Sequence, residues 1–416
     1  MSPATASNGA WNGSAEAPAG VPAVWLARIA LSNFRSYAAA ELKTDGRPVV
    51  LTGANGAGKT NLLEAISYLV PGRGLRGARL SEVDRQPSES EAPGEAPSAP
   101  TSASPSGSFS GSWAVSAEVM TPEGPRQLGT GRDPAATGRE RRLVKVDGSL
   151  VSSQQALGDV LGAVWLTPQM DRLFLEGAPG RRRFLDRLVL TFDPAHAGRI
   201  TAYEHALRER ARILRGDGGP ADPAWLTALE ETMAERGIAV AAARRDLVGR
   251  LAAACAEAEG AFPRAGLGLA GDVEAWLAEG PALEAEDRFK AALAASRCQD
   301  ADNGGAALGP HRSDLAVRHL ARRMPAAQCS TGEQKALLIS IVLAHARLVG
   351  LERGQAPLLL LDEIVAHLDA QRRAALFEAL LSLGAQAWMT GTDRSLFEDI
   401  GTAALFVTVR DSRLTP

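Results

Sequence analysis

Residues Gly53–Thr60 constrain the fold of this chain more than any other segment. They fit the pattern G-x-x-x-x-G-K-[ST]. An apolar run at 48–52, short and rich in β-branched residues, precedes them, and helical spacing over 61–70 follows. A strand, a glycine-rich turn and a helix together aim backbone N–H groups at phosphate oxygens, at the positive end of the helix dipole. The sequence therefore predicts an α/β phosphate-binding fold, and an ordinary structural turn is the alternative.

Within this loop the two polar side chains have separate predicted roles. Lys59 would reach the β- and γ-phosphates of a nucleotide, and Thr60 would bind Mg²⁺. Lysine is scarce in this chain, at positions 43, 59, 145, 290 and 335 only, so a lysine here is informative. We expect the whole loop to bind the nucleotide: Gly53, Ala54, Asn55, Gly56, Ala57, Gly58, Lys59 and Thr60.

A second run near the other end of the chain closes on two acids. Four leucines at 358–361 precede Asp362 and Glu363. A buried strand that delivers carboxylates at its carboxyl end is where open α/β sheets keep their ligand chemistry. Asp362 would hold Mg²⁺, and Glu363 would orient and activate the attacking water. The alternative is a strand followed by a solvated helix cap.

The distance between the two motifs indicates how the fold is divided. Lys59 and Asp362 are 303 positions apart (362 − 59), much farther than in a compact kinase or small GTPase. The segment between about 194 and 262 is strongly helical, which predicts a helical arm or lobe inserted into a split sheet. We predict a head in two parts, 24–193 and 301–416, around a helical lobe at 194–300.

A third motif begins a long helix before the acidic strand. Ser330, Gly332 and Gln334 form an S-x-G-x-Q helix start, with Glu333 in the first turn and Lys335 directly after it. The helix is predicted to run to about residue 349 and is apolar nearly all round, so it should be buried. Such a helix start offers a second helix N-terminus to a γ-phosphate, and an ordinary capping box is the alternative.

Composition excludes several classes of protein. The 45 basic and 48 acidic residues give a net charge of −3, which argues against a polybasic nucleic-acid coat protein. No apolar run reaches the ~18 residues of a membrane span, and the three cysteines lack zinc or disulfide spacing, which favours the reducing cytosol. The Ala/Gly/Pro/Ser-rich segments 1–23 and 86–112 are interpreted as a disordered tail and a flexible insertion.

Taken together, the motifs resemble the RecF family of bacterial recombination mediator ATPases, within the ABC-like group that includes SMC proteins. The resemblance covers about 24–410, without the insertion. It also rests on blocks at 31–37, 167–169, 177–186, 309–314 and 366–369. Two positions depart from the pattern of many relatives: Ala366 replaces a serine, and Thr392 is the candidate for the position of a switch histidine.

The resemblance implies a function and further site residues. It implies an ABC-type ATPase head that binds ATP and Mg²⁺ and forms a head-to-head dimer, with nucleotide on one subunit meeting Ser330 of the other. Arg35, Gln169 and Asp369 are added to the nucleotide site by position in the family's blocks. It further implies weak, DNA-stimulated ATP hydrolysis in the cytoplasm. The implied partners are gapped and single-stranded DNA, single-strand/double-strand junctions, RecR, RecO and RecA.

The arginines offer partial support for DNA binding. Arg181 and Arg182 could contact phosphates without reading sequence, or an arginine of the run 181–183 could pair with Asp186. A helix with arginines at 208, 210, 212 and 215 could also contact phosphates, and an ordinary solvated face is the alternative there. His311 and Arg312 lie either near the nucleotide or dimer seam, or in a structural turn.

Three other functions stay open at this point. A transport ATPase subunit usually has its two motifs closer together and needs a membrane partner. A related SMC-like or nuclease-fused ATPase would carry long heptad arms or an acidic nuclease cluster, which the sequence lacks. A nucleotide-gated DNA scaffold with negligible turnover shares every motif above.

Overall fold

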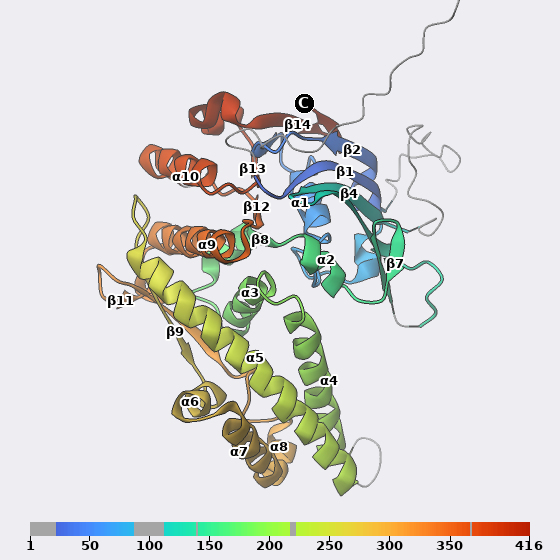
Figure 1. The fold of residues 1–416 in the computed structure, drawn as a ribbon, viewed down its shortest axis with the longest axis vertical. Coiled ribbons are helices and arrows are strands. Elements are labelled where there is room, and N and C mark those ends of the chain that lie inside the picture. The colour runs from blue at the N-terminus through green and yellow to red at the C-terminus, as the bar shows by residue number, and fades with distance from the viewer. Residues whose placement is uncertain (1–21, 87–111, 139, 217–221, 367) are drawn as a thin grey trace, which may run out of the picture.

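A computed structural model describes residues 22–86, 112–138, 140–216, 222–366 and 368–416. The tail and the insertion predicted at 1–23 and 86–112 lie almost entirely outside these residues. Three sheets and ten α-helices make up the described part of the chain. The two larger sheets lie at one end, and helices α4 to α8 extend from them toward the other end (Figure 1).

The central sheet is mixed and contains the strands that carry both motifs. Its order is β15-β14-β3-β13-β12-β8, and neighbouring strands from β14 to β8 are parallel. The bounds are β3 Val49–Thr52, β8 Ala163–Leu166, β12 Leu358–Leu361, β13 Ala387–Gly391, β14 Leu405–Arg410 and β15 Arg413–Thr415. Strands from the two ends of the chain therefore alternate in one sheet, as the split head predicts.

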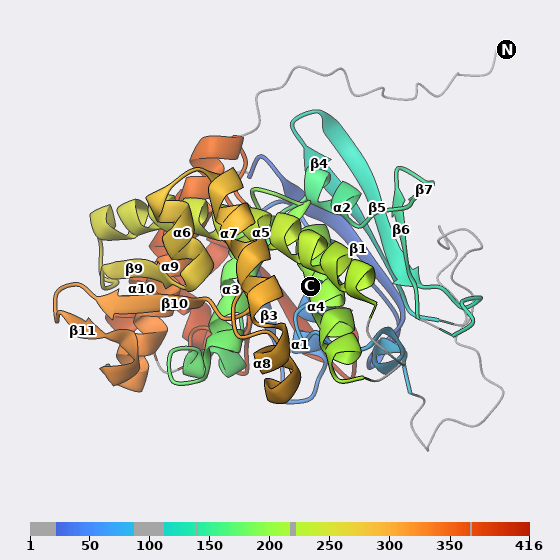
Figure 2. The same cartoon turned by 90° about the horizontal axis from the view of Figure 1, so that it is seen from below.

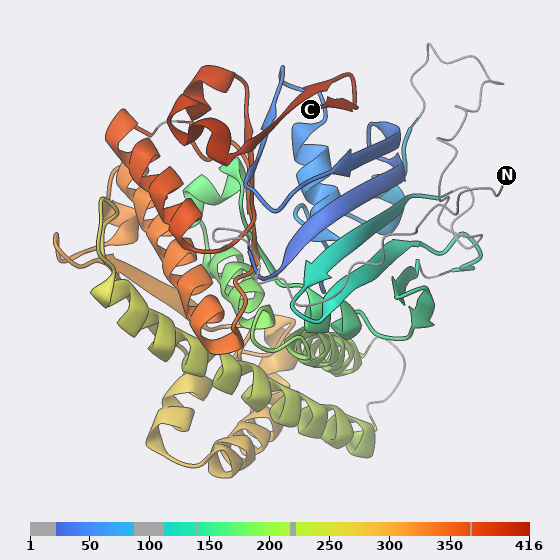
Figure 3. The same ribbon diagram turned by 45° about the horizontal axis from the view of Figure 1, so that its top comes forward.

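An antiparallel sheet packs over α1 (Lys59–Ser67), in the order β2-β1-β4-β5-β6-β7. Its strands are β1 Trp25–Phe34, β2 Tyr37–Lys43, β4 Ala114–Thr121, β5 Gly124–Arg132, β6 Arg142–Val146 and β7 Ser149–Val151. Figure 3 shows this sheet and α1 on one side of the molecule, and α9 and α10 on the other. Short helical segments η1 Leu80–Val83 and α2 Gln155–Val160 complete this part.

Strand β12 explains why the central sheet is buried on both faces. All four of its leucines are buried. Leu358 and Leu360 join the core formed with α1, and Leu359 and Leu361 join the core formed with α9. Because successive side chains of a strand point to opposite faces, a continuous leucine run is what a doubly covered sheet requires.

Helix α9, Thr331–Arg353, forms most of the second core. It begins where the sequence predicts and ends four residues later than predicted. It is long and apolar enough to cross a membrane, but 78% of its apolar window is buried within the fold. It is therefore the core helix of this domain, and α10 (Ala370–Ser382), α3 (Ala178–Leu190) and η4 (Arg394–Ala403) lie around the same core.

The region predicted as a helical lobe is only partly helical. Its helices are α4 His196–Leu214, α5 Pro223–Glu257, α6 Asp272–Glu279, α7 Ala282–Ala295 and α8 Arg297–Asn303. Strand β9 (Ala265–Ala270) was not predicted, and it pairs with β10 (Asp314–His319), which also pairs with β11 (Met324–Pro325). Its Ala/Gly-rich sequence has no strand propensity of its own, so pairing with Leu315 and Val317 of β10 determines its conformation. Figure 2 shows this small sheet beside α9 and α6.

A buried ion-pair cluster connects helices α4, α5 and α8 of the lobe. Arg210 donates to Glu230 at 2.9 Å and to Asp300 at 2.8 Å, and its side chain is 1% exposed. This burial contradicts the interpretation in which Arg210 contacts DNA phosphates. The exposed Arg208 and Arg212 pair with glutamates of the same helix.

We expect Arg210→Ala to lower the free energy of unfolding by about 3–5 kcal/mol, because it leaves the buried Asp300 without a cation and Glu230 with Arg297 alone. Urea denaturation followed by circular dichroism measures this change. Arg208→Ala is the matched control, since its exposed pair with Glu204 is expected to contribute less than about 1 kcal/mol. Equal stability of the two variants would contradict the structural role of Arg210.

Candidate nucleotide site

The phosphate-binding loop leaves β3 and enters α1, as the motif predicts. Gly53 has φ 153°, and a Cβ there would collide with the carbonyl oxygen of Val409 on β14. Gly58 has φ 112°, and its carbonyl accepts a hydrogen bond of 3.1 Å from the hydroxyl of Tyr37. Glycine is required at both positions, at the first because β14 lies against the backbone and at the second because of its left-handed conformation.

Lys59 lies folded against its own loop. Its Nζ donates to the carbonyl oxygens of Gly53 at 2.7 Å and Ala54 at 2.8 Å, and the residue is 5% exposed. Burial lowers the pKa of Lys59, and the nearby carboxylates of Glu363 and Asp362 oppose that shift. The ammonium group therefore lies between the loop and the two acids of the second motif.

The two motifs meet through a direct hydrogen bond. The Thr60 hydroxyl donates to Asp362, with oxygens 2.9 and 3.1 Å away. Thr390, at the carboxyl end of β13, donates to the same carboxylate at 2.8 Å. The sequence thus predicts correctly that residues 302 positions apart converge at one sheet edge, but it missed Thr390. The sequence feature that could have identified Thr390 is its hydroxyl near the carboxyl end of a predicted strand.

A hydroxyl and a buried carboxylate are hard oxygen ligands, which suit Mg²⁺. Within the described ranges, no group of three or more His, Cys, Asp or Glu could hold a metal ion by itself. Mg²⁺ at Thr60 and Asp362 would therefore need further oxygens from nucleotide and water, as is usual for this ion.

Glu363 follows Asp362 in an unusual backbone conformation. Its φ is 50°, which is uncommon for a residue other than glycine. Its N–H donates to the Thr390 hydroxyl at 2.8 Å, and this bond holds the turn at the end of β12. Strain of this kind is often found at functional sites, which fits the role predicted for Glu363.

Helix α9 begins with the predicted capping box. The Ser330 hydroxyl and the Glu333 side chain each bond the backbone N–H of the other residue, and Ser330 is exposed. Gly332, which is half-buried, lies in the same first turn. Gln334 is different, because its side chain is buried and donates to Cys329 O at 2.8 Å. That position makes it part of the helix start and gives no support to a direct nucleotide contact.

Lys335 connects this helix start to the acidic strand end. Its Nζ donates to the carbonyl of Ala366 at 2.9 Å and lies 3.4 Å from that of Glu363. It also lies 3.5 Å from a carboxylate oxygen of Asp171. The side chain therefore links α9, the segment after β12 and the segment after β8, a role that the sequence did not predict.

The other predicted nucleotide contacts are distributed around this edge. Gln169 follows β8 and is exposed, beside the strand end that carries Asp362. Asp369 is the exposed N-cap of α10, and Thr392 is exposed after β13. Arg35 makes a two-point ion pair with the buried Glu64 of α1, so it reaches the loop only through that helix.

The arginines proposed as DNA contacts are held within the fold. Arg181 pairs with Asp314 at 2.7 Å, and Arg182 donates to the carbonyl of Ser313 at 2.7 Å. The pairing considered with Asp186 is wrong, because that carboxylate binds Arg244 at 2.7 Å and His196 at 2.9 Å.

His311 lies in a structural turn, one of its two predicted positions. Its ring bonds the Tyr203 hydroxyl at 2.6 Å and the Ala306 carbonyl at 2.9 Å. Burial lowers the pKa of His311 to about 4, so it is neutral at physiological pH. Arg312 bonds the same carbonyl.

The sheet, the loop and the facing acids define an ABC-type ATPase head. The sequence model described as "RecF/RecN/SMC N terminal domain" matches residues 25–414. A solved structure of "the recombination mediator protein RecF-ATPrS in RecFOR pathway" is similar with a TM-score of 0.76 and 20% identity, covering 95% of this chain and 98% of that one. An SMC head domain from Pyrococcus furiosus has a TM-score of 0.51 and 15% identity, with 94% and 95% covered.

Sequence relatives show to which family of ABC-type ATPases the chain belongs. A "DNA replication and repair protein RecF" from Rhizobium etli is 46% identical over 393 residues, 94% of this chain and 98% of the relative. A protein of the same name from Caulobacter vibrioides is 48% identical over 397 residues, with 94% and 97% covered. The chain belongs to the RecF family. It is therefore a RecF-type ATPase of DNA repair, and the predicted family and fold class are confirmed.

Proposed function

We propose that this protein is an ATP-dependent recombination mediator that dimerises on ATP at DNA gaps and at single-strand/double-strand junctions. The observation that carries the proposal is the bond between Thr60 and Asp362, which brings the two motifs from the two ends of the chain together at one sheet edge. Membership of the RecF family supports the DNA substrate. The transport ATPase alternative loses its support, because the relatives are DNA repair proteins.

Within the site, each group has a distinct task. Bound ATP supplies the phosphoanhydride that is hydrolysed, and Mg²⁺ neutralises part of its charge. Lys59 binds phosphate oxygens, and Thr60 with Asp362 holds the metal. Glu363 accepts a proton from the attacking water, and the bond from its N–H to Thr390 fixes its backbone. Lys335 and Thr390 are positioning residues for this pair of acids.

Dimerisation links nucleotide binding at this site to the closing of two subunits into a clamp. Ser330 is exposed at a helix N-terminus that has one acid, Glu333, in its first turn, and Asp369 is exposed at the start of α10. In the proposed head-to-head dimer these groups face the nucleotide of the opposite subunit. A γ-phosphate that makes contacts only in the closed dimer shifts the population toward closure, and hydrolysis reverses the shift.

The proposed cellular role follows from the family. The protein would act in the cytoplasm with RecR and RecO to load RecA on gapped or single-stranded DNA, and so promote repair, replication restart and SOS induction. Turnover is proposed to be weak and stimulated by DNA, because a clamp of this kind works by persistence in the closed state.

The experiment is an ATPase assay with and without gapped DNA, each with and without RecR. We expect a slow basal rate that rises several-fold with gapped DNA and less with blunt duplex. A rate indistinguishable from that of a Lys59→Ala control under every condition would favour a nucleotide-gated scaffold without turnover. Strong hydrolysis that is indifferent to DNA would contradict the mediator function.

A further inference from the structure

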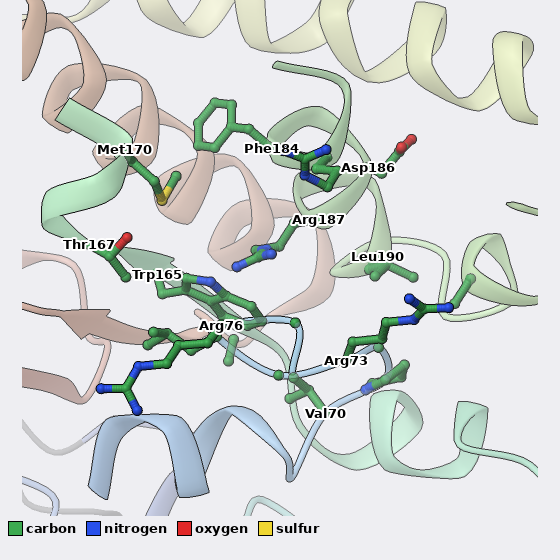
Figure 4. Close-up of a pocket in the computed structure, with 18 of the residues that line it drawn as sticks. Val70, Arg73, Arg76, Trp165, Thr167, Met170, Phe184, Asp186, Arg187 and Leu190 are labelled. Atoms are coloured by element: carbon green, nitrogen blue, oxygen red, sulfur yellow. The ribbon is translucent and has the colours of Figure 1, made fainter. Parts of the chain in front are cut away.

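A cavity of about 650 Å³ lies beside β8, the edge strand of the central sheet, and is separate from the phosphate-binding loop. Its walls are the loop 70–77 after α1, the segment around Trp165, and helices α3 and α4 (Figure 4). Among the described residues that line it, none belongs to the loop 53–60, and Gln169 is the one predicted nucleotide contact among them. The volume is within the range of pockets that bind small ligands or parts of larger ones.

Each acid of this cavity has a base outside the cavity as its nearest ion-pair partner. Asp186 binds Arg244 and His196, as described above. Glu204 lies 3.6 Å from Arg208, and Glu176 lies 3.9 Å from Arg172. None of these bases lines the cavity, so the acids pair with residues outside it and not with its own arginines.

The arginines of the cavity have no such compensation. The side chains of Arg73, Arg183 and Arg187 form no ion pair or hydrogen bond with any residue in the described part of the chain. A fourth, Arg76, shares the single carboxylate of Glu64 with Arg35. The lining therefore carries an excess of positive charge with unused N–H donors.

The positive charge of Arg187 is partly buried within the cavity and is not fully exposed to water. Its guanidinium lies 3.3 Å from the centre of the Trp165 ring, and the residue is half-buried. Arg183, one helical turn earlier, is exposed and repels it, as like charges at i and i+4 do. Burial, and then Arg183, lower the pKa of Arg187 to about 9, so it remains a cation at neutral pH. Figure 4 shows Arg187 above Trp165 within the cavity.

We propose that this cavity binds a phosphate group, held by the arginines that line it, Arg187 over Trp165 together with Arg183 and Arg73. Several convergent guanidinium groups suit the multiple charge and planar oxygen pairs of phosphate better than a single carboxylate. The phosphate can come from a DNA strand or from a free phosphate compound. The strand source rests on the proposed DNA-binding function, and it moves the predicted DNA contact from Arg181 and Arg182 to the next arginines of the same helix.

The test uses the full chain with two probes, a 5′-phosphorylated single-stranded oligonucleotide and inorganic pyrophosphate. Trp165 serves as the reporter, by the difference in emission between the protein and its Trp165→Phe variant. Because pyrophosphate also suits the phosphate-binding loop, its titration is repeated in a Lys59→Ala background. The variants are Arg187→Met, which keeps an unbranched side chain against Trp165, and Arg183→Ala at an exposed position that folding does not depend on.

We expect each variant to weaken binding of at least one probe by about tenfold or more. For the oligonucleotide, the slope of log K against log salt should fall by about one for each arginine–phosphate interaction that the substitution removes. Arg47→Ala is the control, since that exposed arginine pairs with Asp45 and does not line the cavity. Circular dichroism verifies that Arg187→Met folds.

The outcomes separate the sources and the two proposals. Weaker binding of the oligonucleotide alone identifies strand phosphate, and weaker binding of pyrophosphate alone identifies a free phosphate compound. Unchanged affinity for both probes in Arg183→Ala and in folded Arg187→Met overturns the cavity proposal, even if gapped DNA still stimulates hydrolysis. Conversely, the protein could bind no DNA while its affinity for pyrophosphate falls in the two arginine variants. That result would support the cavity proposal and overturn the proposed function.

Discussion

Lys59→Arg is expected to abolish ATP-driven dimerisation. The Lys59 ammonium is compact and buried, and it fits between two loop carbonyls at 2.7 and 2.8 Å. A guanidinium is wider and planar, and it cannot replace three donors on a point charge in that space. Without its phosphate contacts, ATP loses the affinity that distinguishes the closed dimer from the open monomer. Light scattering with and without ATP measures the change in mass.

Lys290→Arg is the matched control for this prediction. Lys290 is at the surface of α7 and pairs with Glu286, so the same substitution there should leave ATP-driven dimerisation unchanged. Circular dichroism verifies that both variants fold, so that a loss of dimerisation in Lys59→Arg reports on the loop and not on unfolding. If Lys59→Arg dimerises normally with ATP, the assignment of the loop as the nucleotide switch is wrong.

The parts of this fold that could be predicted are those in which local sequence and tertiary structure agree. The loop at 53–60 needs glycine at fixed positions, and only glycine fits there, so the motif and the geometry carry the same information. The leucine run of β12 is buried on both faces, which its composition already indicates. The capping box of α9 is local, since Ser330 and Glu333 bond each other's backbone.

The missed features depend on contacts between distant segments. Strand β9 has a sequence of Ala, Gly and Leu and becomes a strand because β10 pairs with it. Thr390 could not be distinguished from other threonines until β13 was placed beside β12. Arg181 finds Asp314, which is 133 positions away, rather than a carboxylate on its own helix. Charge alone does not identify a partner, because a long arginine side chain can reach several.

Arg183 and its neighbours illustrate how the structure changes the interpretation of one sequence run. All three arginines at 181–183 look alike in the sequence, yet one is ion-paired, one bonds a carbonyl and one is exposed without a partner among the described residues. The side with free donors is the side that faces the cavity. DNA contact, where it occurs through this helix, is therefore expected at the unpaired member.

Glu363→Gln is expected to trap the ATP-bound dimer. Glutamine keeps the shape of the side chain and cannot accept the proton of the attacking water, so hydrolysis should fall by about 10²-fold or more. Asp362 and Thr60 are untouched, so the metal ligands remain. Removal of a carboxylate near the γ-phosphate position also reduces repulsion, which favours nucleotide binding. The closed state therefore forms and does not reopen.

The measurements are the ATPase rate and the lifetime of the dimer on a sizing column after ATP is removed. Glu398→Gln is the matched control, because Glu398 is exposed on the segment 394–403 and should behave as the natural protein. Thr390→Val tests positioning: it keeps both carboxylates but removes the hydroxyl that accepts from the Glu363 N–H and donates to Asp362. A long-lived dimer in Glu363→Gln with slow hydrolysis supports the assigned role. Rapid dissociation of that variant with ATP present would instead show that another group activates the water.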